Sequence, residues 1–319
     1  MVEGLERRGH KCTLFLYDVN SDDVSRHEDV IRRCWPGMKA AIESATPRIE
    51  GVDAVVASSW QTAHVVASRV TGPVRCFYFV QDFEPYFYPR GSLYTLSELS
   101  YHLGLGLVAL GDMVATRLEQ ESGITPALTV PFGCDTEVYR LLDGSRSAGS
   151  RRGIVFYAKR SADRRGYLLA KLALERFHEM HPDEEIHVYG DNVANWRIRV
   201  TNHGNLPPAE LNALYNRTKA GLVMSFTNIS LAAEELLAAG CRPVLNDSAL
   251  ARADFPGPDA VWAQPSPAAL AAALSSVVRD QDGTAPAAAP FRVRQGWGQT
   301  QTMVADLIEA ACRGVLSRG

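Results

Sequence analysis

Four basic side chains gather in one short stretch of the chain, residues 153–166, which reads GIVFYAKRSADRRG. A β-rich run ends near Tyr157 and a helix begins near Gly166, so the basic residues fall in the loop between them. Cations at the carboxyl end of a strand suit a diphosphate, because charge-assisted hydrogen bonds to phosphate are strong and arginine donates two at once. The alternative is a solvated basic loop. The residues predicted to bind a diphosphate are Lys159, Arg160, Arg164 and Arg165.

A second stretch, residues 221–246, reads GLVMSFTNISLAAEELLAAGCRPVLN and predicts a strand, a short polar loop, a helix and another strand. The free backbone N–H groups at the start of such a helix bind anions such as phosphate. Glu235 lies about one turn into the helix, where its carboxylate could accept hydrogen bonds from two ribose hydroxyls. Otherwise Glu234 and Glu235 are solvated helix residues. The residues predicted to meet the phosphates are Asn228, Ile229, Ser230 and Leu231.

A third stretch, residues 77–89, reads FYFVQDFEPYFYP and holds seven of the 27 aromatic residues of the chain. Aromatic walls with polar groups suit a sugar, which has apolar ring faces and a rim of hydroxyls. A carboxylate in such a site, Asp82 or Glu84, could act as the base that deprotonates an acceptor hydroxyl. The alternative is an aromatic core cluster, which we favour for Phe77 and Phe79. The residues predicted to contact the acceptor are Gln81, Phe83, Tyr86 and Phe87.

The elements that must position these residues alternate between strands and helices along the whole chain. The 319 residues, 46% hydrophobic and 22% charged, suffice for two globular domains. Blocks of alternating strands and helices on both sides of a Gly-, Ser- and Arg-rich stretch predict two doubly wound α/β domains. We expect an acceptor-binding domain at 1–140, a linker at 141–152, a nucleotide-sugar domain at 153–296 and a C-terminal helix at 297–319 that returns to the first domain.

The opening of the chain predicts one further feature of the first domain. Residues 1–17 read as a helix followed by a strand, whereas a doubly wound domain opens with a strand. We therefore expect the first strand of this domain to be missing from the chain.

Composition and motifs exclude several classes of protein. A net charge of −3 disfavours a broad nucleic-acid surface, and no Gly-x-Gly-x-x-Gly or Walker loop follows a strand. No apolar run is long enough for a transmembrane helix, so contact with a membrane would be peripheral. The six cysteines form no Cys-x-x-Cys pair and read as reduced residues of a cytoplasmic protein. We predict no metal site, and the sequence carries no signal for a particular oligomeric state.

The stretch 221–246 resembles the donor-binding segment of GT-B glycosyltransferases of the glycogen-synthase-like superfamily. Thr227 stands where that family has its first glutamate, so only the second glutamate, Glu235, carries over as the residue that binds the nucleotide ribose. The residues that match the family pattern are Ser225, Glu235, Gly240, Pro243 and Val244.

A narrower resemblance is to bacterial dTDP-rhamnose rhamnosyltransferases. Residues 156–159, FYAK, and 164–166, RRG, are similar to the Phe-Tyr-Ala-Arg and Arg-Arg-Gly of that group. Residues 81–87 resemble its Gln-Asp-x-Glu-Pro-x-Phe. Lys159 replaces the first arginine of this pattern. Lysine keeps the positive charge but cannot donate the two parallel hydrogen bonds that an arginine gives to a phosphate.

The resemblance implies a GT-B fold, in which two Rossmann-like domains face each other across a cleft. It implies a metal-independent hexosyltransferase at the inner face of the membrane, with no cofactor other than a nucleotide-diphosphate sugar donor such as dTDP-rhamnose. The acceptor would be a glycan, a lipid-linked sugar or a small molecule, and Tyr189, Gly190 and Leu206 would contact the base. Two alternatives stay open: a UDP- or GDP-sugar donor, and a catalytically degenerate GT-B partner subunit.

Overall fold

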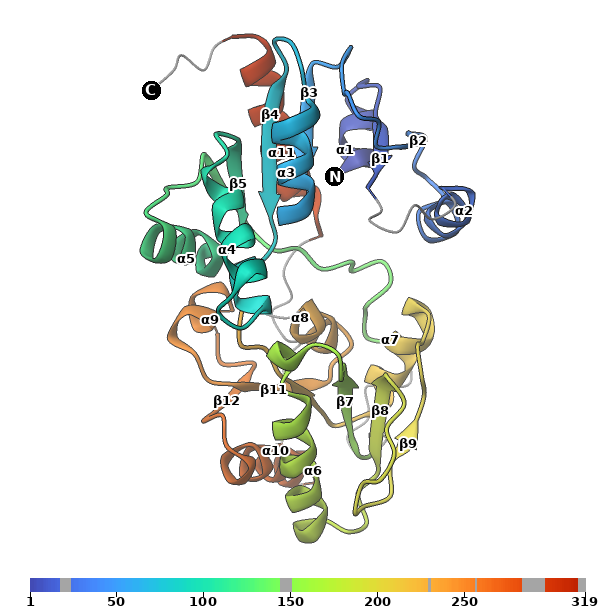
Figure 1. Cartoon of the computed structure of the whole chain (residues 1–319). Coiled ribbons are helices and arrows are strands. Elements are labelled where there is room, and N and C mark those ends of the chain that lie inside the picture. The colour runs from blue at the N-terminus through green and yellow to red at the C-terminus, as the bar shows by residue number, and fades with distance from the viewer. Residues whose placement is uncertain (18–23, 144–150, 229–230, 256, 283–295, 315–319) are drawn as a thin grey trace. The chain divides into compact units, whose positions relative to one another are not determined.

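The computed structural model describes residues 1–17, 24–143, 151–228, 231–255, 257–282 and 296–314 (Figure 1). The chain divides into two compact units. Unit 1 consists of residues 1–131 and 297–319, and unit 2 consists of residues 132–296.

Unit 1 contains a parallel sheet of four strands in the order β3-β4-β5-β6, and a separate parallel pair, β1-β2. Ser59 begins the helix that follows β3 with a capping box, in which its side chain and that of Thr62 satisfy each other's backbone N–H groups. The strands are β1 (Thr13–Leu16), β2 (Ala41–Ser44), β3 (Ala54–Ala57), β4 (Arg75–Val80), β5 (Gly106–Leu110) and β6 (Leu128–Val130). The helices are α1 (Val2–Arg7), α2 (Val24–Cys34), α3 (Trp60–Arg69), α4 (Ser92–Leu99), α5 (Asp112–Ser122), α11 (Gly298–Cys312) and the short 3₁₀ turns η1 (Glu84–Phe87) and η2 (Ser100–His102).

Unit 2 is built on one parallel sheet of six strands in the order β12-β11-β10-β7-β8-β9. The central strands β7 and β10 are largely buried on both faces, which explains why they read as continuous apolar runs. The strands are β7 (Ile154–Ala158), β8 (Ile186–Gly190), β9 (Thr201–Asn202), β10 (Ala220–Val223), β11 (Arg242–Asn246) and β12 (Val261–Ala263). The helices are α6 (Tyr167–Met180), α7 (Pro208–Arg217), α8 (Leu231–Ala238), α9 (Ala249–Asp254), α10 (Pro267–Asp282) and the 3₁₀ turn η3 (Asp163–Arg165).

Each unit has its own hydrophobic core. In unit 2, the buried face of α6 packs with α10 against β7 and β10, around Phe156, Leu174 and Phe177. In unit 1, α3 and α5 cover β4 and β5 around Tyr78 and Leu118. The predicted α/β class with parallel sheets is the observed one.

The boundary between the two units falls after residue 131. It lies nine residues before residue 140, the predicted end of the first domain. Residues 132–142 belong to unit 2, because two asparagines of α7 hold this segment. The side chain of Asn212 accepts a hydrogen bond from Arg140 N at 3.1 Å, and that of Asn216 accepts one from Leu142 N at 2.9 Å. Residues 144–150 of the predicted linker and 315–319 of the predicted last helix lie outside the described residues.

The C-terminal helix α11 belongs to unit 1, where it packs against α1, β4 and β6 (Figure 1). Arg8 ties the end of α1 to this helix through Asp306 at 2.6 Å and Glu309 at 2.8 Å. Thr300 also donates to the backbone oxygen of Pro131, at 2.5 Å. The sequence patterns did not predict α2, β2, β9 or α9, which are short or carry few apolar residues.

Candidate functional site

The predicted donor-binding residues that the structure describes gather at one edge of the unit 2 sheet. The strands β7, β8 and β10 are neighbours and run parallel, so their carboxyl ends meet at the same edge. The basic loop 159–165 follows β7, Tyr189 and Gly190 end β8, and Ser225 lies just beyond β10. Sites in open α/β sheets form at this edge.

Asp191 organises the first part of the basic loop. Its Oδ2 accepts a hydrogen bond from Arg160 N at 2.7 Å, and its Oδ1 lies 4.0 Å from Lys159 Nζ. The backbone N–H of Asp191 donates to Ala158 O at 2.9 Å. The carboxylate therefore holds the turn at the end of β7 while the Lys159 side chain stays 43% exposed and open to a ligand.

Arg165 connects the basic loop to the loop after β10. Its Nη1 donates to Ser225 Oγ at 3.0 Å, and the backbone N–H of Phe226 donates to Arg164 O at 3.0 Å. Gly166 then turns the chain into α6 with a φ of +61°. A Cβ here would stand 3.1 Å from Met224 Cβ and from the Phe226 ring, so this turn requires glycine.

The loop between β10 and α8 is anchored at its start. Asn246, at the end of β11, accepts from Ser225 N at 2.8 Å and donates to Ser225 O at 2.7 Å. Asn228 is partly buried and accepts from Ser225 Oγ at 3.4 Å, and Leu231 opens α8 with an exposed side chain. Ile229 and Ser230, predicted to bind phosphate, lie outside the described residues.

Glu235 lies among tyrosines of unit 2. Burial, followed by the charge of Asp135, raises the pKa of Glu235 to about 7, and a hydrogen bond from Tyr215 opposes the shift. The hydroxyl of Tyr215, on α7, is also 2.6 Å from that of Tyr189, on β8. Glu235 is therefore no solvated helix glutamate, since it shares a largely desolvated environment with Tyr139, Tyr189 and Tyr215.

The residues predicted to hold the base lie beside this cluster. Tyr189 stacks on Tyr157 with ring centroids 5.1 Å apart, and burial raises the pKa of Tyr189. Gly190 has a φ of +90° and donates to Gly204 O at 2.9 Å, which brings the turn before Leu206 to the end of β8. Leu206 is partly buried.

The carboxylates of unit 1 lie at the carboxyl edge of its four-stranded sheet, after β4. Asp82 and Glu84 are both buried, at 4% and 5% exposure. Glu84 Oε2 accepts from the backbone N–H of Trp60 at 2.8 Å, so it binds a free donor of the first turn of α3. Gln81 is exposed and donates to Ser58 O, at the end of β3, at 3.3 Å. The catalytic role of either carboxylate remains a prediction, but the bond to Trp60 shows that Glu84 also stabilises the loop.

The aromatic residues of this loop divide into two groups. Phe83 is completely buried and packs against Tyr86 and Tyr101, with ring centroids at 4.8 and 5.6 Å. The prediction that Phe83 contacts an acceptor is therefore wrong, because its ring fills the core and has no face open to a ligand. Tyr86 and Phe87 are partly buried, and the Tyr86 hydroxyl donates to Glu121 at 2.7 Å.

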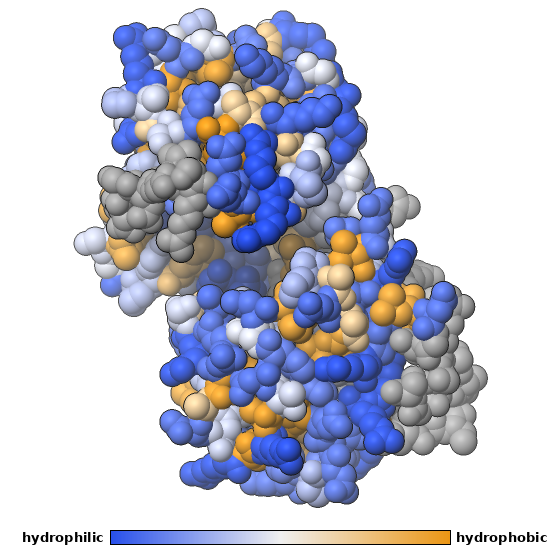
Figure 2. Space-filling view, turned by 90° about the vertical axis from the view of Figure 1, so that its right-hand side faces the viewer, coloured by the Kyte–Doolittle hydropathy of each residue, from blue (hydrophilic) through white to orange (hydrophobic). Residues whose placement is uncertain are grey.

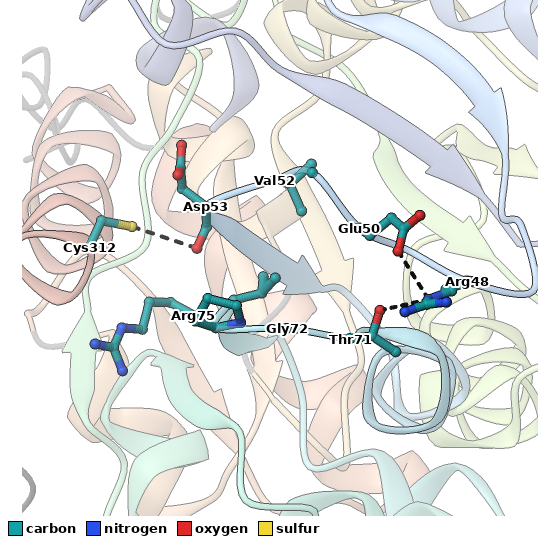
Figure 3. Close-up of a pocket in the computed structure, with 11 residues that line it drawn as sticks. Arg48, Glu50, Val52, Asp53, Thr71, Gly72, Arg75 and Cys312 are labelled. Carbon is teal, nitrogen blue, oxygen red and sulfur yellow. Dashed lines mark hydrogen bonds and ion pairs between the residues drawn. The ribbon is translucent and has the colours of Figure 1, made fainter.

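A separate hollow of about 500 Å³ lies at the opposite, amino edge of the unit 1 sheet (Figure 3). It is lined by the segments before β3 and β4 and by Cys312 of α11. Arg48 donates there to Thr71 and pairs with Glu50, both at 3.0 Å. None of the predicted site residues lines this hollow.

Two further properties concern the described part of the chain. No group of three or more His, Cys, Asp or Glu side chains is placed there to hold a metal ion. Within the same ranges, no helix is long and apolar enough to span a bilayer. Figure 2 shows a face on which hydrophilic residues predominate and hydrophobic residues gather in small groups.

Comparison with known proteins finds relatives of both units. A family model described as WsaF, C-terminal domain, matches residues 152–275. The O-antigen biosynthesis protein RfbC of Myxococcus xanthus is 26% identical over 287 residues, which make up 85% of this chain and 22% of RfbC. The chain thus spans about a fifth of the length of this relative.

Solved structures with a similar fold share little sequence with the chain. A putative UDP-N-acetylglucosamine 2-epimerase from Listeria monocytogenes has a TM-score of 0.64 and 13% identity, over 100% of this chain and 93% of its own. The pneumococcal O-GlcNAc transferase GtfA, solved with UDP and GlcNAc, has a TM-score of 0.54 and 13% identity, over 81% and 55%. These likenesses confirm the predicted GT-B fold with two Rossmann-like domains.

Several residues of the site were not predicted from the sequence. Asp191 and Asn246 each follow or end a strand and hold a loop of the neighbouring strand. A polar residue at the end of a predicted parallel strand is a signal that could have found both. Tyr215 carries no such signal, because it lies in the apolar pattern of α7.

Proposed function

We propose that the chain is a glycosyltransferase that moves a sugar, rhamnose, from a nucleotide-diphosphate donor to a glycan or lipid-linked acceptor. The observation that supports this function best is the meeting of three groups at one edge of the unit 2 sheet. These groups are the cations around Arg165, the loop before α8, and Glu235 with its tyrosines. Such a site can hold phosphates at one end and a ribose at the other.

In this proposal the basic loop stabilises the leaving group. Breaking the bond between the sugar and the diphosphate places negative charge on the β-phosphate, and prearranged cations lower the energy of that charge. Asp191 keeps Lys159 and the backbone of Arg160 in place. Glu235 binds the ribose, and Gly190 and Leu206 contact the base.

The acceptor binds in unit 1, beside Gln81, Tyr86 and Phe87. Asp82 or Glu84 takes the proton of the acceptor hydroxyl when that oxygen attacks the sugar carbon. The similarity to RfbC supports a polysaccharide of the O-antigen type as the product. The similarity of residues 156–166 and 81–87 to rhamnosyltransferases supports dTDP-rhamnose as the donor.

The test is a panel of dTDP-, UDP- and GDP-sugars, with binding measured by calorimetry and sugar release or transfer measured by chromatography. We expect binding and turnover of dTDP-rhamnose, and at least tenfold weaker binding to Arg165→Ala, since a charge-assisted phosphate contact contributes about 2 kcal/mol. Arg176→Ala, which removes an exposed arginine of α6, is the matched control.

Each other outcome revises the proposal in a defined way. Preference for a UDP- or GDP-sugar would change the proposed donor and leave the proposed glycosyl transfer unchanged. Donor binding without turnover identifies a degenerate partner subunit. Conversion of the donor into an epimer, or no binding of any nucleotide sugar, refutes the transferase.

A further inference from the structure

Two large apolar side chains near the start of α8 in unit 2 are exposed, and one of them belongs to a residue that contacts the basic loop. Phe226 is 46% exposed and Leu231 is 39% exposed, although most large hydrophobic residues of this unit are buried. They flank the loop that precedes α8, on either side of Thr227 and Asn228.

The Phe226 ring is held against the basic loop. Its backbone N–H donates to Arg164 O at 3.0 Å, and its Cε2 lies 3.1 Å from where a Cβ of Gly166 would stand. The ring therefore contacts the turn that carries Arg164 and Arg165, and glycine is the residue that leaves space for it.

In the donor site proposed above, this position would place the ring near the sugar of the donor. A sugar esterified to the diphosphate extends directly from the phosphate that the arginines hold. A hydroxyl turned toward an aromatic face loses water and gains no hydrogen bond, whereas a methyl group gains from the same contact. The hydroxyl of the preceding residue, Ser225 Oγ, accepts a hydrogen bond from Arg165.

We propose that Phe226 is a specificity-determining residue that packs against carbon C6 of the donor sugar and selects 6-deoxyhexoses. The proposal rests on the nucleotide-sugar site proposed above and adds the residue that recognises the sugar and the carbon that it contacts. A hydrophobic contact of this kind discriminates against an added hydroxyl by about 10- to 100-fold.

The experiment compares two donors that differ only in the C6 hydroxyl, dTDP-L-rhamnose and dTDP-L-mannose, and uses dTDP as the reference without sugar. Calorimetry with the whole chain gives Kd for the unaltered protein, Phe226→Ala and Phe226→Leu. Leu172→Ala is the matched control, because Leu172 is 43% exposed on α6 and lies outside the predicted site. Circular dichroism shows whether each variant folds.

We expect the unaltered protein to prefer the rhamnose donor at least tenfold. Phe226→Ala should reduce this preference about tenfold, the loss of one aromatic contact, and leave dTDP binding unchanged. Phe226→Leu should keep part of the preference, and it decides the question if Phe226→Ala does not fold.

Equal affinity for the two donors overturns the inference, and so does a preference for the rhamnose donor that persists in both Phe226 variants. In either case, binding of dTDP would still support a nucleotide site. Absence of dTDP binding in the unaltered protein overturns the inference together with the dTDP-sugar donor on which it rests.

Discussion

Replacing Glu235 by glutamine should stabilise the protein, and by an amount that grows with pH. Burial raises the pKa of this carboxyl from 4.5 to about 7 in the folded chain. In the unfolded chain it titrates near its ordinary value. Between these two values the folded state binds more protons than the unfolded state, so the free energy of unfolding falls as pH rises.

The size of the effect follows from the shift. The pKa moves by about 2.5 units, from 4.5 to about 7, and each unit is worth about 1.4 kcal/mol. The charged carboxylate therefore costs about 3 kcal/mol of stability above pH 7, and nothing below pH 4. Glutamine keeps the shape and can accept the hydrogen bond from Tyr215 without this cost.

Urea unfolding of the unaltered protein and Glu235→Gln, at intervals between pH 4.5 and 8.5, measures this difference. We expect the two proteins to be nearly equal at pH 4.5 and the variant to be about 3 kcal/mol more stable at pH 8. Glu179→Gln, which changes an exposed glutamate of α6, is the control and should show no such trend. A difference that does not change with pH would refute the assignment of Glu235 as a desolvated acid.

Three other substitutions test the loops around the two sites. Asp191→Ala should weaken nucleotide-sugar binding about fivefold in calorimetry, since it removes a hydrogen bond worth about 1 kcal/mol. Asp191→Asn should retain most of the affinity. Equal losses of affinity in the two variants would contradict a positioning role. Glu84→Ala should lower the free energy of unfolding by about 2 kcal/mol because it leaves the buried Trp60 N–H without its acceptor, and Glu84→Gln should not. An unchanged free energy of unfolding for Glu84→Ala in urea would refute the structural role. Gly166→Ala should cost at least about 1 kcal/mol, because its left-handed φ and its contact with Met224 both oppose a side chain; an unchanged melting temperature would show that the turn is not strained.

The sequence predicted those parts of the candidate site in unit 2 that lie directly after the ends of strands. Residues that follow β7 and β10 must share an edge once the strands are parallel neighbours, and Arg165 does contact Ser225. The sequence could not show which strands are neighbours of which. The position of Asp191 after a strand is visible in the sequence, but only the pairing of β8 with β7 shows that its carboxylate binds the loop after β7.

In the aromatic loop of unit 1, by contrast, residue type did not show which side chains belong to the core. Phe83 and Phe87 have the same residue type and lie four positions apart, yet Phe83 is completely buried and Phe87 is partly exposed. Aromatic rings stabilise cores and ligand sites through the same contacts, so their type does not separate the two roles. Glu84 was likewise ambiguous, because only the position of α3 supplies its partner Trp60 N.

The sequence by itself determined the α/β class, most of the strands and helices, and the three stretches that carry charge, free helix N–H groups and aromatic rings. These properties follow from local periodicity and composition, which act over a few residues. Only the tertiary structure decided the order of the strands and the desolvation of Glu235 among three tyrosines. Desolvation and hydrogen bonding depend on residues that are distant in the chain, and only folding brings those residues into contact.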